Sequence, residues 1–216
     1  ATQDADALLD LGADVVCYTA SFDIRPDGVI DDLCRILASG ANMVSTSFVP
    51  LLHPAHAGPG VLDRLEAALQ EGGTSFYTSG IDPGFGNAGI TIHALALCKE
   101  VRTVRMMEIV NYATWDNPFT MFEIMGFGKA DPSQSLLLSP GSTTMAWGPV
   151  VALVAASMGL ELDEITEAHE ILLADEDVTI ASGVVAAGTI SGMRFEIKGV
   201  VDGEERVVVE HVTRLR

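Results

Sequence analysis

The feature that most constrains the fold is a regular alternation of short apolar stretches and amphipathic stretches up to residue 80. Three apolar stretches, at 13–19, 42–47 and 74–78, have the length of buried strands. Between them, apolar residues recur at helical spacing, from Val29 to Leu37 and from Leu62 to Leu69. Helices that connect short apolar strands are typical of a parallel, doubly wound sheet. The sequence therefore predicts such a sheet.

Each predicted strand runs into small or polar residues, and ligands of parallel α/β sheets bind where the strands end. Small side chains at that edge allow a cofactor to approach the backbone. We therefore expect a cofactor-binding rim, for which ordinary strand ends are the alternative interpretation. Its residues on the first two strands are Tyr18, Thr19, Ala20, Ser21, Ser45, Thr46 and Ser47.

The pattern changes after residue 86. A helix is expected at about 87–99, a long β-like run at 101–112 and an apolar helix at 143–159. Beyond residue 163 the helical signal stops. Antiparallel strands are predicted at 178–180, 183–190, 194–201 and 206–214, with turns at Gly192 and at Asp202-Gly203.

These patterns define the predicted fold class. It is α/β, with an incomplete Rossmann-type parallel sheet followed by an α+β domain that has a mixed, largely antiparallel sheet. The expected domains are 1–86 and 87–216. A nucleotide-binding sheet normally opens with a strand, a Gly-rich turn and a helix. Because residues 4–11 look like the tail of a connection, we expect the front of this domain to lie outside the sequence.

A Gly-x-Gly-x-x-Gly pattern occurs at Gly84–Gly89, between a predicted strand and a predicted helix. Glu108 follows about 20 residues later, where a dinucleotide site has an acid for the ribose. Three residues that end in Pro83 separate the strand from the first glycine, and proline removes an N–H group. We therefore favour a Gly-rich hinge between domains, with the dinucleotide fingerprint as the alternative.

Charge and composition restrict the expected partners. The chain has 30 acidic against 12 basic residues, a formal net charge of −18, which repels nucleic acid and anionic membranes. No apolar run reaches the roughly 20 residues that span a bilayer. Cys17, Cys34 and Cys98 lack a metal-binding spacing and predict reduced, buried thiols in a cytoplasmic protein. A small-molecule substrate is the expected partner.

The segment Gly80-Ile81-Asp82-Pro83-Gly84-Phe85 resembles the Gly-x-Asn-Pro-Gly-Phe loop of the 2,4-diaminopentanoate dehydrogenases and native amine dehydrogenases, which are relatives of dihydrodipicolinate reductase. Further parts of the chain are similar to that family in the same order. The resemblance implies NAD(P) as cofactor, with a slight preference for NADP. It also implies hydride transfer between the nicotinamide and an imine or carbonyl carbon, and a homodimer built through the second domain.

Two residues depart from the family pattern. Asp82 replaces the family's asparagine, and Phe48 stands where amine-forming members carry a glutamate. An aromatic residue at this position removes a charge and a proton acceptor, so an apolar carbonyl or C=C substrate becomes an alternative to an amine. A non-catalytic nucleotide-binding module and a structural oligomer on the same fold are the remaining alternatives.

The resemblance and the residue types together define the other candidate site residues. Gly80, Ile81, Pro83 and Gly84 are expected beside the nicotinamide, and Asp82, Glu123 and His93 are the candidates for catalysis. His93 is also consistent with a core residue of an apolar helix. No metal is expected, because His53 and His56 lack a third ligand nearby. The predicted apolar substrate wall, which could equally be core, consists of Phe48, Tyr112, Trp115, Phe119, Phe122 and Met125.

Overall fold

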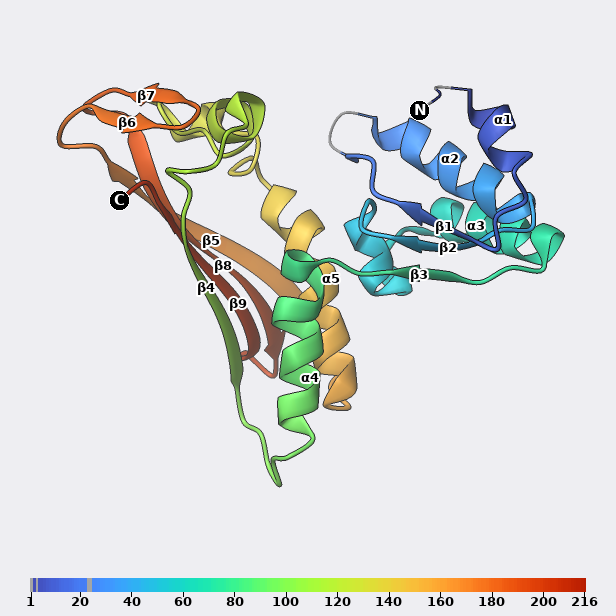
Figure 1. Ribbon diagram of the computed structural model, residues 1–216. Helices are drawn as coiled ribbons and strands as arrows, with labels where there is room; N and C mark the ends of the chain where they lie inside the picture. Colours follow the sequence, from blue (N-terminus) through green and yellow to red (C-terminus); the bar gives the residue numbers. More distant parts are fainter. Residues whose placement is uncertain (1, 3, 23–24) are drawn as a thin grey trace. The chain divides into compact units, whose positions relative to one another are not determined.

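The computed structural model describes residues 2, 4–22 and 25–216 (Figure 1). The chain divides into two compact units, Ala1–Gly86 and Asn87–Arg216, which are described one at a time. In the described part of the chain, no helix has the length and apolar character needed to cross a membrane.

The first unit is built on a three-stranded parallel sheet in the order β1-β2-β3. Its strands are β1 (Val15–Tyr18), β2 (Asn42–Ser45) and β3 (Phe76–Thr78). The register places Tyr18 opposite Ser45 and Ser45 opposite Thr78, so the carboxyl ends of the strands are aligned. The predicted parallel sheet is confirmed. The helices of this unit are α1 (Ala5–Leu9), α2 (Pro26–Ala38) and α3 (Pro59–Gly72), with short 3-10 turns at Val49–Leu52 and Pro54–His56.

Helices α2 and α3 pack on the same face of this sheet, whereas a doubly wound sheet has helices on both faces. Strand β2 shows the difference between the faces, since Met43 is 1% exposed in the core and Val44 is 41% exposed. Cys17 also lies on the exposed face. The prediction of three buried thiols is therefore wrong for Cys17, and for Cys98 too, because both are exposed.

The two helices approach closely at Gly72, the last residue of α3. A Cβ atom at Gly72 would lie only 1.9 Å from the carbonyl oxygen of Leu37 in α2. That oxygen is held in place, because it accepts hydrogen bonds from the Gly40 N–H and the Thr74 hydroxyl. A side chain at position 72 therefore requires the helices to separate.

The second unit contains a four-stranded mixed sheet in the order β4-β9-β8-β5 (Figure 1). β4 runs parallel to β9, whereas β9 with β8 and β8 with β5 are antiparallel. One face is covered by α5 (Ser142–Ser157), and α4 (Ile90–Leu95) packs beside α5. The strands are β4 (Val104–Asn111), β5 (Glu164–Leu173), β8 (Ile190–Val201) and β9 (Glu204–Arg214); β6 (Val178–Ile180) and β7 (Gly183–Val185) form a separate hairpin.

The second unit confirms some details of the prediction and corrects others. Asp202 and Gly203 both have positive φ, as the predicted tight turn between β8 and β9 requires. The prediction of a turn at Gly192 is wrong, because this residue lies inside β8 and pairs with Arg214. The predicted strand 183–190 is divided, since β7 ends at Val185 and β8 begins at Ile190. Strand β5 was not predicted.

The N-terminus of α5 is fixed by a carboxylate from strand β5. Glu167 accepts hydrogen bonds from the backbone N–H groups of Gly141 and Thr144 and from the hydroxyls of Thr143 and Thr144. Burial raises the pKa of Glu167, but these hydrogen bonds together outweigh burial and hold the pKa below its usual value. The acceptor at this helix N-terminus comes from strand β5, which follows α5 in sequence, and not from the residues just before the helix.

We predict that Gly72→Ala lowers the free energy of unfolding of the first unit by about 1–3 kcal/mol, because the added methyl group overpacks the contact between the two helices. Gly60→Ala is the matched control, since Gly60 lies in the same helix and a Cβ atom there meets nothing within 4 Å. The control is expected to be stabilising by up to about 1 kcal/mol. Urea unfolding followed by circular dichroism measures both. Equal stability of the two variants would contradict the predicted helix contact.

We predict that Glu167→Gln destabilises the second unit by about 1–2 kcal/mol near neutral pH, because the amide is a weaker acceptor for N–H groups at a helix N-terminus. A depressed folded-state pKa gives stability that is present above the unfolded pKa and is lost as pH falls through the folded pKa. The difference between wild type and variant should therefore shrink in acid. Urea unfolding at about pH 7 and about pH 3 tests this. Glu164→Gln, at an exposed position of the same strand, is the control and should have little effect at either pH.

Candidate functional site

The aligned strand ends of the first unit form the rim at which the sequence predicted a cofactor. The ladder continues past the last residues of the strands, because the Thr46 N–H donates to the Tyr18 carbonyl at 3.3 Å and the Ser79 N–H donates to the Ser45 carbonyl at 3.0 Å. The three strand ends are thereby held next to one another as a single edge.

Some of the predicted rim side chains support the rim itself. The Ser45 hydroxyl accepts from the Ser47 N–H at 3.0 Å, and the Ser47 hydroxyl donates to the Tyr18 carbonyl at 3.4 Å. Both serine side chains are buried. In contrast, Thr19, Ala20, Ser21 and Thr46 are exposed.

The backbone of Tyr18 is part of the rim, whereas its side chain contacts helix α2. Its hydroxyl donates to Asp32 of α2 at 2.7 Å, and Arg25 lies 3.5 Å from the same carboxylate. Burial, followed by the hydrogen bond to Asp32, raises the pKa of Tyr18 to about 12. The phenol therefore stays protonated at neutral pH and acts here as a tie between β1 and α2.

The loop after β3 is folded tightly on itself. The Asp82-Pro83 peptide bond is cis, Gly84 has φ +146°, and the Phe85 N–H donates to the Gly80 carbonyl at 2.7 Å. A Cβ atom at Gly80 would lie 2.6 Å from the Pro83 carbonyl oxygen, so the turn itself requires a glycine there. Ile81 is 75% exposed and Phe85 is 54% exposed, so the loop presents two large apolar side chains to solvent.

The Gly-x-Gly-x-x-Gly pattern does not form the tight strand-to-helix turn of a dinucleotide fingerprint. Asp82, Pro83 and Gly84 have non-helical backbone angles, and α4 begins only at Ile90. The boundary between the two units falls inside the pattern, at Gly86.

Phe48, the aromatic residue at the family's glutamate position, lies in the core of the first unit. It is 6% exposed, and its ring is 4.8 Å from that of Phe22 with a tilt of 57°. Little of its side chain is available within this unit to contact a substrate, so its effect on the site is to supply apolar volume where a carboxylate would carry charge.

The predicted substrate wall of the second unit divides into exposed and buried residues. Trp115 and Phe119 are exposed, and Trp115 packs against Tyr112 with ring centroids 5.8 Å apart. Met125 is buried, whereas Phe122 is half-buried and lies against Gly183 of the β6–β7 hairpin. The exposed aromatic residues are the part of this segment that a ligand can reach.

Two of the predicted catalytic side chains are engaged in local contacts of the second unit. His93 is exposed, and its Nδ1 atom lies 2.7 Å from the carbonyl oxygen of Gly89. Glu123 is also exposed and forms an ion pair with Lys129 at 3.0 Å. Their catalytic roles remain predictions.

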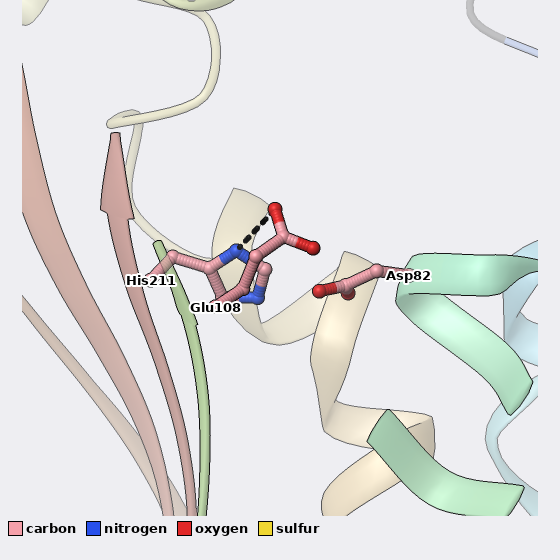
Figure 2. A group of neighbouring side chains, drawn as sticks. All are labelled: Asp82, Glu108 and His211. Atoms are coloured by element: carbon pink, nitrogen blue, oxygen red, sulfur yellow. Dashed lines mark ion pairs between the residues drawn. The ribbon is translucent and has the colours of Figure 1, made fainter. Parts of the chain in front are cut away.

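A buried imidazole next to a carboxylate lies on the α5 side of the second sheet. Figure 2 shows Glu108 of β4 and His211 of β9 on neighbouring strands, with Oε1 and Nδ1 3.7 Å apart. His211 is 3% exposed and stacks on Phe195 with centroids 4.7 Å apart, and Trp147 of α5 packs against both rings. The contact thus places a carboxylate beside a buried imidazole that is surrounded by aromatic rings.

From sequence, Glu108 was a candidate for ribose binding, whereas His211 was not selected. A signal was present, because a histidine interrupts the apolar run of β9 on the same face as Val207 and Val209. In a strand, residues two apart share a face, so this polar side chain must enter the core.

Comparison with known proteins defines the class. The described fold matches the amine dehydrogenase structure from Mycobacterium smegmatis with a TM-score of 0.74 and 17% identity, covering 100% of this chain and 63% of that one. It also matches biliverdin reductase from Synechocystis, solved with biliverdin and NADP+, with a TM-score of 0.55 and 11% identity, covering 99% and 57%. The chain therefore shares its fold with part of each of these two structures.

The sequence is also similar to those of two known dehydrogenases. The chain is 38% identical over 216 residues to an amine dehydrogenase from Streptomyces virginiae, and 24% identical over 210 residues to 2,4-diaminopentanoate dehydrogenase from Acetoanaerobium sticklandii. These alignments cover 100% and 95% of this chain, which spans 60% and 58% of the two relatives. No family model matches the sequence. The chain is therefore similar along its length to an amine dehydrogenase and to a 2,4-diaminopentanoate dehydrogenase.

Proposed function

We propose that the protein is an NAD(P)-dependent oxidoreductase that transfers hydride between the nicotinamide and an imine or carbonyl carbon of a small, rather apolar substrate. The observation that carries this proposal is the rim of the first unit, where aligned strand ends present small exposed residues in a chain 38% identical to an amine dehydrogenase. Ligands of parallel α/β sheets bind at this edge.

The residues at the rim fit a dinucleotide. Thr19, Ala20, Ser21 and Thr46 are small and exposed, so the cofactor can approach the backbone of the first two strand ends, while Ile81 offers an apolar surface. The net charge of −18 does not oppose this, because backbone N–H groups can hold phosphates without basic side chains. When bound, the nicotinamide supplies the hydride chemistry, and the chain's residues supply orientation and water exclusion.

Two observations bear on whether the substrate carbon is a carbonyl or an imine carbon, and they point in different directions. Phe48 cannot accept a proton, which favours an apolar carbonyl substrate, whereas the names of both relatives favour an amine. The Glu108–His211 pair offers a proton-exchanging group that does not depend on the family's glutamate. A non-catalytic nucleotide-binding protein on the same fold is the alternative, for which cofactor binding without turnover would be the evidence.

The proposal is tested by titrating NADPH and NADH into the full-length protein and following nicotinamide fluorescence. We predict saturable binding, and we predict that Thr46→Asp weakens it at least about tenfold, because a carboxylate at the rim repels the pyrophosphate. Thr179→Asp, on an exposed position of β6 in the second unit, adds the same charge and should leave affinity unchanged. Absence of binding to either dinucleotide would refute the oxidoreductase function.

We also propose that a second copy of the chain packs on the face of the mixed sheet opposite α5. This face carries exposed Met107 and Ile109 on β4 and exposed Leu172 on β5. Exposed apolar residues on a face that also carries charged groups are typical of interaction surfaces. The resemblance to the family favours a homodimer as the assembly.

The same face carries a network of ion pairs. Arg194 lies 2.6 Å from Glu210 and 2.7 Å from Glu196, Arg105 contacts both glutamates, and Lys198 lies 3.2 Å from Glu196. Burial raises the pKa values of Glu196 and Glu210, but the surrounding cations outweigh burial and hold both values below the usual range. Both glutamates therefore stay ionised at neutral pH, which fixes the charge pattern that a partner must match.

We predict that Met107→Glu converts the dimer to a monomer, because it places an unpaired carboxylate in the interface. Light scattering after size-exclusion chromatography measures the mass. Met145→Glu is the control, since Met145 is an equally exposed methionine on α5. A monomeric wild-type protein, or a dimer that survives Met107→Glu, would contradict this interface.

A further inference from the structure

A ligand-sized cavity is present in the second unit, and none of the residues that line it was assigned to a site above. It has a volume of about 380 Å³ and is lined by residues from the C-terminal ends of α4 and α5 and from the beginning of β9. This volume falls within the range of about 300–1,000 Å³ that is usual for small-molecule sites. The apolar part of its wall includes Ile92, Leu95, Met158 and Leu160.

The polar part of the wall is cationic. Lys99 and Arg206 line the cavity, and no carboxylate does, although the chain has 30 acidic and only 12 basic residues. Across residues 2, 4–22 and 25–216, neither cation has an ion-pair partner. Two cations without ion-pair partners at one cavity are unusual in so acidic a protein. Their positive charge is complementary to an anionic ligand.

The orientation of one cation is set by the backbone. The Arg206 Nε–H donates to the carbonyl oxygen of Arg102, which fixes the plane of the guanidinium group. This bond uses one of its five N–H donors. The end of α5 also favours nearby cations through the helix dipole. The helix dipole explains why Lys99 and Arg206 lie near this end of α5, but it does not explain the apolar cavity beside them.

We propose that this cavity binds a medium-chain carboxylate. The alkyl chain packs against the apolar wall, where water is displaced from apolar surface. The carboxylate pairs with Arg206 and Lys99, and a guanidinium is well suited to carboxylates because its N–H groups match both oxygens. The site belongs wholly to the second unit and shares no residue with the rim of the first, so it does not depend on the proposed oxidoreductase function.

The test uses octanoate as the probe, titrated into the protein by isothermal calorimetry. Octan-1-ol has the chain without the charge, and acetate has the charge without the chain. We expect octanoate to bind saturably with one site per chain and each comparator to bind at least about tenfold more weakly, because neither satisfies both parts of the wall. Equal binding of octan-1-ol and octanoate, or octanoate binding that does not saturate, would overturn the proposal.

Matched variants locate the binding. Arg206→Gln and Lys99→Gln should each weaken octanoate about tenfold or more, whereas Arg214→Gln, the same change at the other end of β9, should not. Circular dichroism confirms that each variant is folded. Because Lys99 is exposed, its variant decides the result if Arg206→Gln fails to fold. Unchanged affinity in Lys99→Gln, or an equal loss in Arg214→Gln, would show that octanoate binds elsewhere.

Discussion

The first unit depends on the backbone pairing of β2 with a strand on each side. Four residues of β2 are bonded to β1 and three to β3, and the ladder is extended by the N–H groups of Thr46 and Ser79. This pairing alone brings together residues 18–21, 45–47 and 78–80, which are far apart in sequence. Helices α2 and α3 bury the side chains on one face of the sheet, and this packing holds the strands in place.

Much of this unit could be predicted from sequence because its signals are local. The strands are short and continuous in apolar character, and each helix is amphipathic, so both periodicities are visible in windows of ten residues. The rim followed from the same reasoning, since the carboxyl ends of parallel strands meet at one edge. Which rim side chains face outward could not be predicted, because the Tyr18 and Ser47 side chains are turned inward by hydrogen bonds with partners elsewhere in the chain.

The second unit was less predictable because its decisive contacts are non-local. Strand β5 contains three glutamates and is mostly exposed, so it lacks the apolar alternation by which strands are recognised. Glu167 is nevertheless the acceptor for the N-terminus of α5, a role that only tertiary structure reveals. The Glu108–His211 pair likewise forms only when two strands about a hundred residues apart become neighbours.

The position of β9 has a consequence for how the second unit is made. β9 lies between β4 and β8, and it pairs with β4 about a hundred residues after β4 has left the ribosome. Closing so long a loop costs conformational entropy before any contact repays it, and such non-local pairing slows folding. During synthesis, β4 therefore has unpaired edges until β9 has been made, and its Met107 and Ile109 side chains are exposed. Until β9 has paired with β4, exposed apolar residues and unpaired strand edges favour aggregation of this unit.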